Sequence, residues 1–109
     1  MDIDIFIVAL NQMRVIDPEI QAQTIAVFLE VARQPEGIKM QELAEKVGIS
    51  QSSVSRNVAA LSHMHRVGRP GYDLVVAFED PAERRRKIVR LTPKGKRVAK
   101  ELERVLDGG

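Results

Sequence analysis

Apolar residues recur at three- and four-residue steps through most of the chain, which is the spacing of helical faces. Residues 3–14 carry such a stripe, and an alternating apolar pattern within them leaves a strand open as the alternative. A second helix is predicted to begin at Asp17, because aspartate is a good N-cap and Pro18 suits the first helical position. Its apolar face ends near residues 34–37, where Pro and Gly favour a turn.

Two shorter helices are predicted at residues 40–47 and 51–63. Gly48 ends the first of them, because the chain must reverse through a left-handed residue that glycine adopts without steric cost. Ser50 supplies the N-cap of the second. Two helices joined by so short a turn predict a helix-turn-helix.

The pattern changes from helical to strand-like after this pair. Residues 74–78 and 87–91 are rich in β-branched and apolar types and read as the two strands of a hairpin. The segment 38–39 is short and can pair in the same small sheet. Thr92 then caps, and Pro93 starts, a last helix that runs to the end of the chain.

This order of elements predicts a mainly α fold with a small β-hairpin, the winged helix-turn-helix, in a single domain of residues 1–109. A chain of 109 residues is the size of one hydrophobic core. No apolar run approaches the roughly 20 residues of a membrane span. Asp2 and Asp4 stand where a secretory signal carries positive charge. We therefore expect a cytoplasmic protein without a membrane partner.

Residues that support catalysis or metal binding are scarce. The chain has no cysteine, which excludes disulfides and thiolate metal sites. His63 and His65 are too few to suggest a zinc site, and their spacing separates them on a helix. The sequence contains no glycine-rich phosphate loop or nucleophile elbow. We expect no enzymatic activity, no cofactor and no metal, and the sequence specifies no small-molecule effector.

Charge is divided unevenly along the chain. Residues 1–62 hold five Lys/Arg and eight Asp/Glu, whereas residues 63–109 hold twelve Lys/Arg and seven Asp/Glu. A basic half on a small protein is typical of polyanion binding. An ordinary solvated basic surface gives the same count, so charge alone does not decide between the two.

The helix predicted at residues 51–63 has one apolar face, formed by Val54, Val58 and Leu61. Its other side is polar, small and cationic, and a helix of this kind can enter a DNA major groove about 12 Å wide. Arginine reads guanine edges, and serine suits bases or phosphates. The alternative is an amphipathic corner that binds no DNA. The candidate contact residues on this helix are Gln51, Ser52, Ser53, Ser55, Arg56 and Asn57.

The loop between the two predicted strands reads EDPAERRRK and projects four consecutive cations. Arginine gains from the negative potential of a narrow minor groove. A solubilising surface loop would have the same composition, but the position beside a helix-turn-helix favours DNA. The candidate residues of this wing are Arg84, Arg85, Arg86 and Lys87.

At these positions the chain resembles the MarR family of bacterial transcriptional regulators. The resemblance rests on three segments: ELAEKVGISQSSVSRNVAAL in the helix-turn-helix, DPAERRRKIVRLT in the wing, and LTPKGKRV at the start of the last helix. Together with the second helix it covers roughly residues 17–100. The Asp-Pro-x-x-Arg-Arg wing followed by Leu-Thr-x-x-Gly is its more specific part.

The resemblance implies roles for particular residues. Ser52, Ser53 and Arg56 are implied to contact DNA from the recognition helix. Arg84 and Arg85 are implied to approach the minor groove from the wing, with Asp80 fixing the loop.

The family's mode of action carries further expectations. Family members are typically homodimers that bind palindromic sites and repress transcription, and many release DNA on binding a small phenolic ligand. They usually carry a longer first helix and a further long helix after the last one found here. The dimer of this chain is therefore expected to use residues 1–14 and 93–107.

A winged helix can also serve as a protein–protein interaction module that touches no DNA, and this is the main alternative function. Such a module should expose large apolar or aromatic side chains on its outer helix face. Residues 51–63 instead present Ser, Arg, Ala and His there, which favours nucleic acid. Double-stranded RNA is less favoured, because its major groove is too narrow for a helix.

Overall fold

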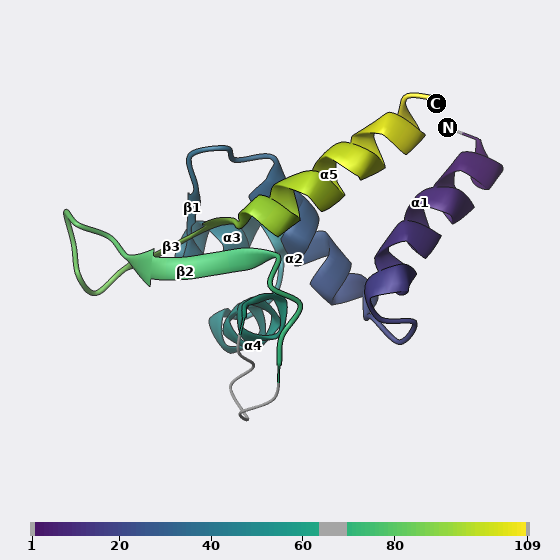
Figure 1. The fold of residues 1–109 in the computed structure, drawn as a ribbon. Coiled ribbons are helices and arrows are strands. Elements are labelled where there is room, and N and C mark those ends of the chain that lie inside the picture. The colour runs from purple at the N-terminus through teal and green to yellow at the C-terminus, as the bar shows by residue number, and fades with distance from the viewer. Residues whose placement is uncertain (1, 64–69, 109) are drawn as a thin grey trace.

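The computed structural model describes residues 2–63 and 70–108, and Figure 1 shows their arrangement. Helices and strands within these ranges are α1 (Ile3–Ile16), α2 (Ala22–Ala32), β1 (Ile38–Lys39), α3 (Met40–Val47), α4 (Gln51–Leu61), β2 (Val75–Glu79), β3 (Lys87–Leu91) and α5 (Pro93–Leu106). The β2–β3 hairpin projects at one end of the molecule, and α1 lies beside α5 at the other. The predicted winged helix-turn-helix fold is confirmed.

Local capping signals set the ends of the helix-turn-helix as predicted. Gly48 follows α3 with φ of 80°, in the left-handed region, and its N–H donates to the Ala44 carbonyl at 2.8 Å. The Ser50 hydroxyl accepts the N–H of Ser53 at 3.1 Å and caps α4. Helix α4 ends at Leu61, two residues before the predicted end at His63.

The start of the second helix was predicted wrongly. The segment 3–14 is helical, as its stripe indicated, but α1 continues to Ile16 and Asp17 is its C-cap. The Asp17 carboxylate accepts the N–H of Glu19 at 2.8 Å, and its carbonyl accepts the N–H of Ile20 at 3.0 Å. These two bonds close a turn, so α2 begins only at Ala22.

A distant residue stabilises this turn. The Tyr72 hydroxyl, from the segment before β2, donates to the Asp17 carboxylate at 2.5 Å. This hydrogen bond, together with the one from the Glu19 N–H, holds the pKa of Asp17 below its ordinary value. Burial and the bond to Asp17 raise the pKa of Tyr72 to about 12. The contact therefore ties the α1–α2 turn to the chain that leaves α4.

The sheet has three antiparallel strands in the order β1-β3-β2. The predicted hairpin is its larger part, with Val75 opposite Leu91 and Glu79 opposite Lys87. Ile38 and Lys39 of β1 pair with Val89 and Ile88 of β3, so the short segment does join the sheet.

The core lies between the inner face of this sheet and the helices, and all five helices contribute buried residues to it. Its largest fully buried side chains are Phe28, Met13, Leu43, Leu61 and Leu74. Leu74 was predicted to open β2, but it lies just before the strand and is fully buried.

The N-terminus of α5 packs unusually closely on the chain before β2. The Thr92 hydroxyl accepts the Gly95 N–H at 3.0 Å and donates to the Asp73 carbonyl at 2.7 Å. A Cβ atom at Gly95 would overlap the Leu74 carbonyl oxygen. This approach explains the glycine in the LTPKG segment. In the described part of the chain, no helix is long and apolar enough to cross a membrane.

Candidate nucleic-acid interface

Helix α4 divides into a buried side and an exposed side. Val54, Val58 and Leu61 are at most 3% exposed and pack into the core. This packing fixes the rotation of the helix about its axis, because the apolar side chains must face inward. The side chains that face outward and are exposed are Gln51, Ser52, Ser55, Arg56 and His63, the last just beyond the helix.

A hydroxyl cluster at the start of α4 orients Arg56. Ser50 Oγ lies 2.9 Å from Ser53 Oγ and 3.1 Å from Ser52 Oγ. Ser53 Oγ in turn accepts from Arg56 Nη2 at 3.1 Å. The guanidinium has further N–H donors in its planar fork. Arg56 is thus held on the outer face with donors able to reach a ligand.

Asn57 does not belong to the outer face, and its inclusion among the candidate contacts is corrected. Its side chain is 8% exposed and lies between α4 and α2. Its carboxamide oxygen accepts from the Thr24 hydroxyl at 2.6 Å, and its nitrogen donates to Gln23 Oε1 and the Ser53 carbonyl at 2.9 Å each. Its hydrogen-bonding groups are therefore engaged inside the protein, where they join the two helices.

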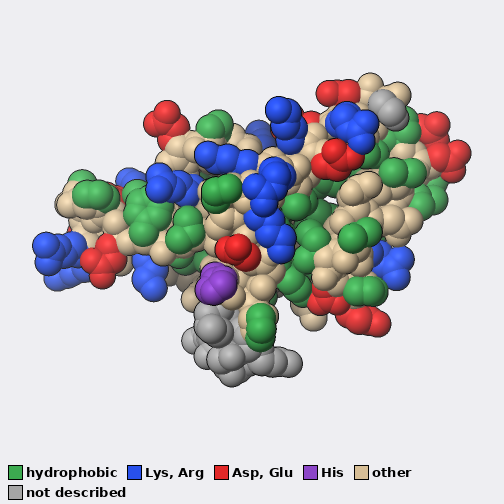
Figure 2. All heavy atoms as spheres, in the orientation of Figure 1, with side chains coloured by type: hydrophobic (Ala, Val, Ile, Leu, Met, Phe, Trp, Pro, Cys, Tyr) green, Lys and Arg blue, Asp and Glu red, His purple; other side chains and the backbone are tan. Residues whose placement is uncertain are grey.

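The wing exposes all four of its predicted cations, Arg84 to Lys87. Asp80, only 9% exposed, accepts the Ala82 N–H at 2.9 Å, and its own N–H donates to the Arg86 carbonyl at 2.9 Å. Glu83 lies 3.8 Å from Arg86 in an exposed ion pair. Asp80 thus fixes the loop as expected, and Figure 2 shows Lys and Arg side chains gathered at its tip, on the left.

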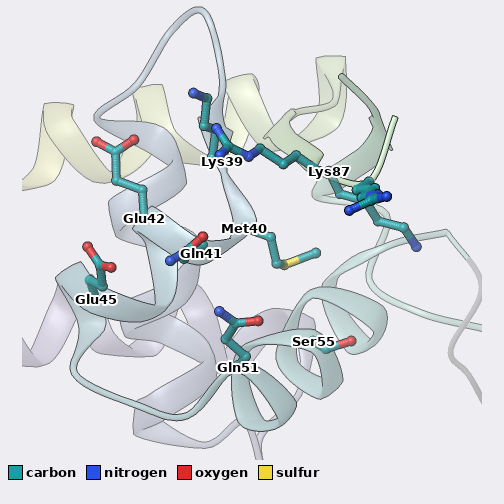
Figure 3. Close-up of a pocket in the computed structure, with 10 residues that line it drawn as sticks. Lys39, Met40, Gln41, Glu42, Glu45, Gln51, Ser55 and Lys87 are labelled. Carbon is teal, nitrogen blue, oxygen red and sulfur yellow. The ribbon is translucent and has the colours of Figure 1, made fainter. Parts of the chain in front are cut away.

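A groove separates α4 from the wing, and Figure 3 looks into it. Its volume is about 410 Å³. Gln51 and Ser55 of α4 line one side, and Arg85, Arg86 and Lys87 of the wing line another. The structure therefore brings the two predicted groups of residues together around one open space.

The third wall of the groove comes from β1 and α3. It consists of Lys39, Met40, Gln41, Glu42 and Glu45. Lys39 was missed in the sequence because it stands apart from other cations, and its only signal was a basic residue just before a predicted helix. Pairing of β1 with β3 places it beside the base of the wing.

The described residues hold no group of three or more His, Cys, Asp or Glu side chains arranged to bind a metal ion. His63 is exposed at the end of α4, and His65 lies outside the described residues. The open groove is lined by polar side chains and cations, together with the two carboxylates of Glu42 and Glu45. Its cations and polar hydrogen-bonding groups suit a polyanion.

These elements define a winged helix-turn-helix protein. A family model described as helix-turn-helix matches residues 29–56, which run from the end of α2 into α4. A search of curated proteins finds no match to the chain.

Solved structures extend the likeness beyond the helix-turn-helix. The PcaV transcriptional regulator from Streptomyces coelicolor is 28% identical, with a TM-score of 0.62 over 83% of this chain and 57% of PcaV. A MarR-family transcriptional regulator from Rhodococcus sp. RHA1 is 24% identical, with a TM-score of 0.67 over 92% of this chain and 64% of its own. MepR from S. aureus, in complex with DNA, is 18% identical, with a TM-score of 0.75 over 92% of this chain and 73% of MepR.

The protein is therefore a winged helix-turn-helix protein that is similar to PcaV and to the MarR-family regulator from Rhodococcus. It spans less than two thirds of the length of PcaV and of the Rhodococcus regulator.

Proposed function

We propose that this protein is a transcriptional regulator that binds double-stranded DNA in a sequence-specific manner. Helix α4 enters the major groove and reads bases through Arg56, with Gln51, Ser52 and Ser55 as further contacts. The wing reaches the adjacent minor groove. The observation that carries the proposal is the placement of an exposed polar helix and a cationic hairpin on either side of one open groove.

The solved relatives support the same reading. PcaV and the Rhodococcus protein are transcriptional regulators, and the MepR structure is a complex with DNA. Fold alone does not fix function, and the exposed residues of α4 and the wing are what favour DNA as the ligand. A DNA target implies a cytoplasmic site of action.

The test combines two measurements on the whole chain. Fluorescence anisotropy with a random-sequence duplex at two salt concentrations reports backbone binding, because release of counterions makes it salt-dependent. Selection from a random duplex library then reports sequence preference. Salt-dependent binding that enriches one sequence supports the proposal, whereas no binding at low salt would assign the fold to protein–protein interaction.

The wing supplies the first prediction. Replacing Arg84 and Arg85 with alanine should weaken binding to every duplex, specific or random, because minor-groove and phosphate contacts by arginine depend little on base identity. The slope of log K against log salt should fall by up to about 2, near 0.9 for each phosphate that the protein no longer neutralises. Salt titrations of the wild type and the double variant measure it. An unchanged slope would mean that the wing does not contact the DNA.

We further propose that the protein binds DNA as a homodimer through α1 and α5. Helix α1 keeps its Ala9 and Met13 side against the core and presents other apolar residues to solvent. The exposed ones include Ile3 (75%), Phe6 (53%), Ile7 (49%) and Leu10 (39%). Figure 2 shows apolar side chains over this end of the molecule, on the right.

Between α1, α2 and α5 this apolar surface forms a shallow groove of about 240 Å³. Its lining is wholly apolar: Phe6, Ala9, Leu10, Met13, Ile25, Leu29, Leu102 and Leu106. A second copy of the chain presents the same surface, so a two-fold interface would cover it on both copies. Two-fold symmetry of the protein in turn favours a palindromic operator with half-sites about one helical turn apart.

Point variants test the dimer better than removal of residues 1–14, because that deletion would also strip Met13 from the core. Ile3→Glu with Ile7→Glu should raise the dimer dissociation constant by about 100-fold or more, since each substitution enters a two-fold interface twice. Sedimentation velocity measures the outcome. Val8→Glu with Val15→Glu, exposed on another side of α1, is the matched control and should leave the dimer intact. If the two double variants had the same dimer dissociation constant, this interface would be rejected.

Repression is the mode of regulation we propose. A dimer seated on an operator that overlaps a promoter excludes RNA polymerase without a further contact. Transcription in vitro from a promoter that contains the selected site should fall when the protein is added, and a rise would identify an activator.

A further inference from the structure

The groove between α4 and the wing has walls of opposite charge, a feature that major- and minor-groove contacts do not explain. Lys39 and the cations Arg85 to Lys87 line the side next to the wing. Glu42 and Glu45 of α3 line the side away from it. Figure 3 shows the two glutamates at the left, Lys87 at the right, and Lys39 between them at the top.

We propose that one sugar–phosphate strand of the DNA runs through this groove along its basic wall, with Lys39 as a phosphate anchor and the two glutamates as its acidic boundary. The inference rests on the proposed DNA-binding function. If α4 lies in a major groove and the wing in the next minor groove, the strand that separates the two grooves must pass between α4 and the wing. The space on the protein between these elements is this groove.

Sheet pairing gives Lys39 a fixed position. Lys39 of β1 lies opposite Ile88 of β3, and Lys87 immediately precedes Ile88 in the same strand. Two lysines that are far apart in the sequence are thereby held at the base of the wing. Lys39 is exposed, and the described part of the chain gives it no ion pair. Its ammonium group can therefore meet a phosphate without breaking an internal contact.

The two glutamates confine the path of the strand. Glu42 and Glu45 are three residues apart on α3, so they share one face of that helix. Both are exposed, and neither forms an ion pair with a described residue. A phosphate on their side of the groove would meet like charges within the screening length of about 8 Å at physiological salt. The favourable path lies on the side of Lys39 and Lys87.

The test uses variants that should change DNA affinity in opposite directions. Each is assayed with the duplex selected by the wild-type protein and with a random duplex. Lys39→Ala should weaken binding to both by about three- to tenfold and lower the salt slope by about 1, the effect of one phosphate left without its lysine. Glu42→Gln with Glu45→Gln should tighten binding about two- to fivefold, because it removes exposed like-charge repulsion. Lys100→Ala removes an equal charge from α5 and should leave the slope unchanged. Misfolding cannot produce this pattern, since it would not tighten binding.

A neutral backbone linkage locates the contact. Each duplex carries one methylphosphonate, placed at a single position between the major-groove bases and the adjacent minor groove. At one of these positions the modification should weaken binding by the wild type. At that same position it should not weaken binding by Lys39→Ala any further. Lys39 would not be a phosphate anchor if the modification weakened binding by Lys39→Ala as much as binding by the wild type at every position. An unchanged salt slope for Lys39→Ala would also overturn the anchor, and either result would leave DNA binding itself intact. Failure of the wild type to bind any duplex would overturn the proposed function instead, and the anchor with it.

Discussion

Replacing Arg56 with alanine should remove much of the protein's discrimination between its selected site and random DNA. The expected loss is about 1–3 kcal/mol, or about 5- to 150-fold in the ratio of the two affinities. Arg56 is the basic residue on the exposed side of α4, and Ser53 holds its guanidinium at 3.1 Å. A planar fork presented in this way can donate two hydrogen bonds to one guanine, which lysine cannot reproduce.

Competition anisotropy, with the selected duplex labelled and random duplex as competitor, measures this ratio. Arg97→Ala on α5 removes the same charge from another exposed surface and should keep the ratio. Arg56→Lys separates charge from geometry, since it should retain binding to random DNA but lose discrimination. If Arg56→Ala keeps its preference for the selected site, α4 does not read bases through this residue.

Gly95→Ala should be strongly destabilising, although it adds a single methyl group to the buried first turn of α5. The added Cβ would overlap the Leu74 carbonyl oxygen and lie 3.0 Å from its carbonyl carbon. Both are backbone atoms of the chain that leads into β2, so neither can rotate away. We expect a loss of about 3 kcal/mol in the free energy of unfolding, at the upper end of overpacking effects.

Urea unfolding of the wild type and variant measures this loss. Gly48→Ala is the matched control, because its Cβ would meet nothing within 4 Å but its φ of 80° is left-handed. That variant should lower the free energy of unfolding by about 1 kcal/mol, because alanine is strained in the left-handed conformation. A loss at Gly95 no larger than the loss at Gly48 would mean that α5 can shift away from β2 without cost.

Three helix boundaries could be predicted from the sequence because their signals are local. Ser50 and Thr92 each cap a helix through an N–H three residues ahead, and Gly48 ends α3 through its own backbone conformation. The strand Lys87–Leu91 was likewise placed at its observed bounds. Such signals depend on residue types within one turn of the position they specify.

Three other assignments needed partners that lie far along the chain. Asp17 has the local signature of an N-cap, but it closes a turn whose carboxylate binds Tyr72, 55 residues away. Asn57 resembles an outer-face residue because its neighbours are polar, but it bonds to Thr24, 33 residues away. The one local signal of Lys39 is its place just before a predicted helix, which does not indicate a role, and only strand pairing places it beside the wing.

The sequence by itself determined the order of the elements, the buried side of α4 and the cationic character of the wing. These follow from residue spacing and capping, which act within a few residues. Tertiary structure decided which polar side chains of α4 remain exposed and which cations and acids share a groove with them. Those outcomes depend on how helices pack and strands pair, because packing brings together residues whose separation in sequence carries no local signal.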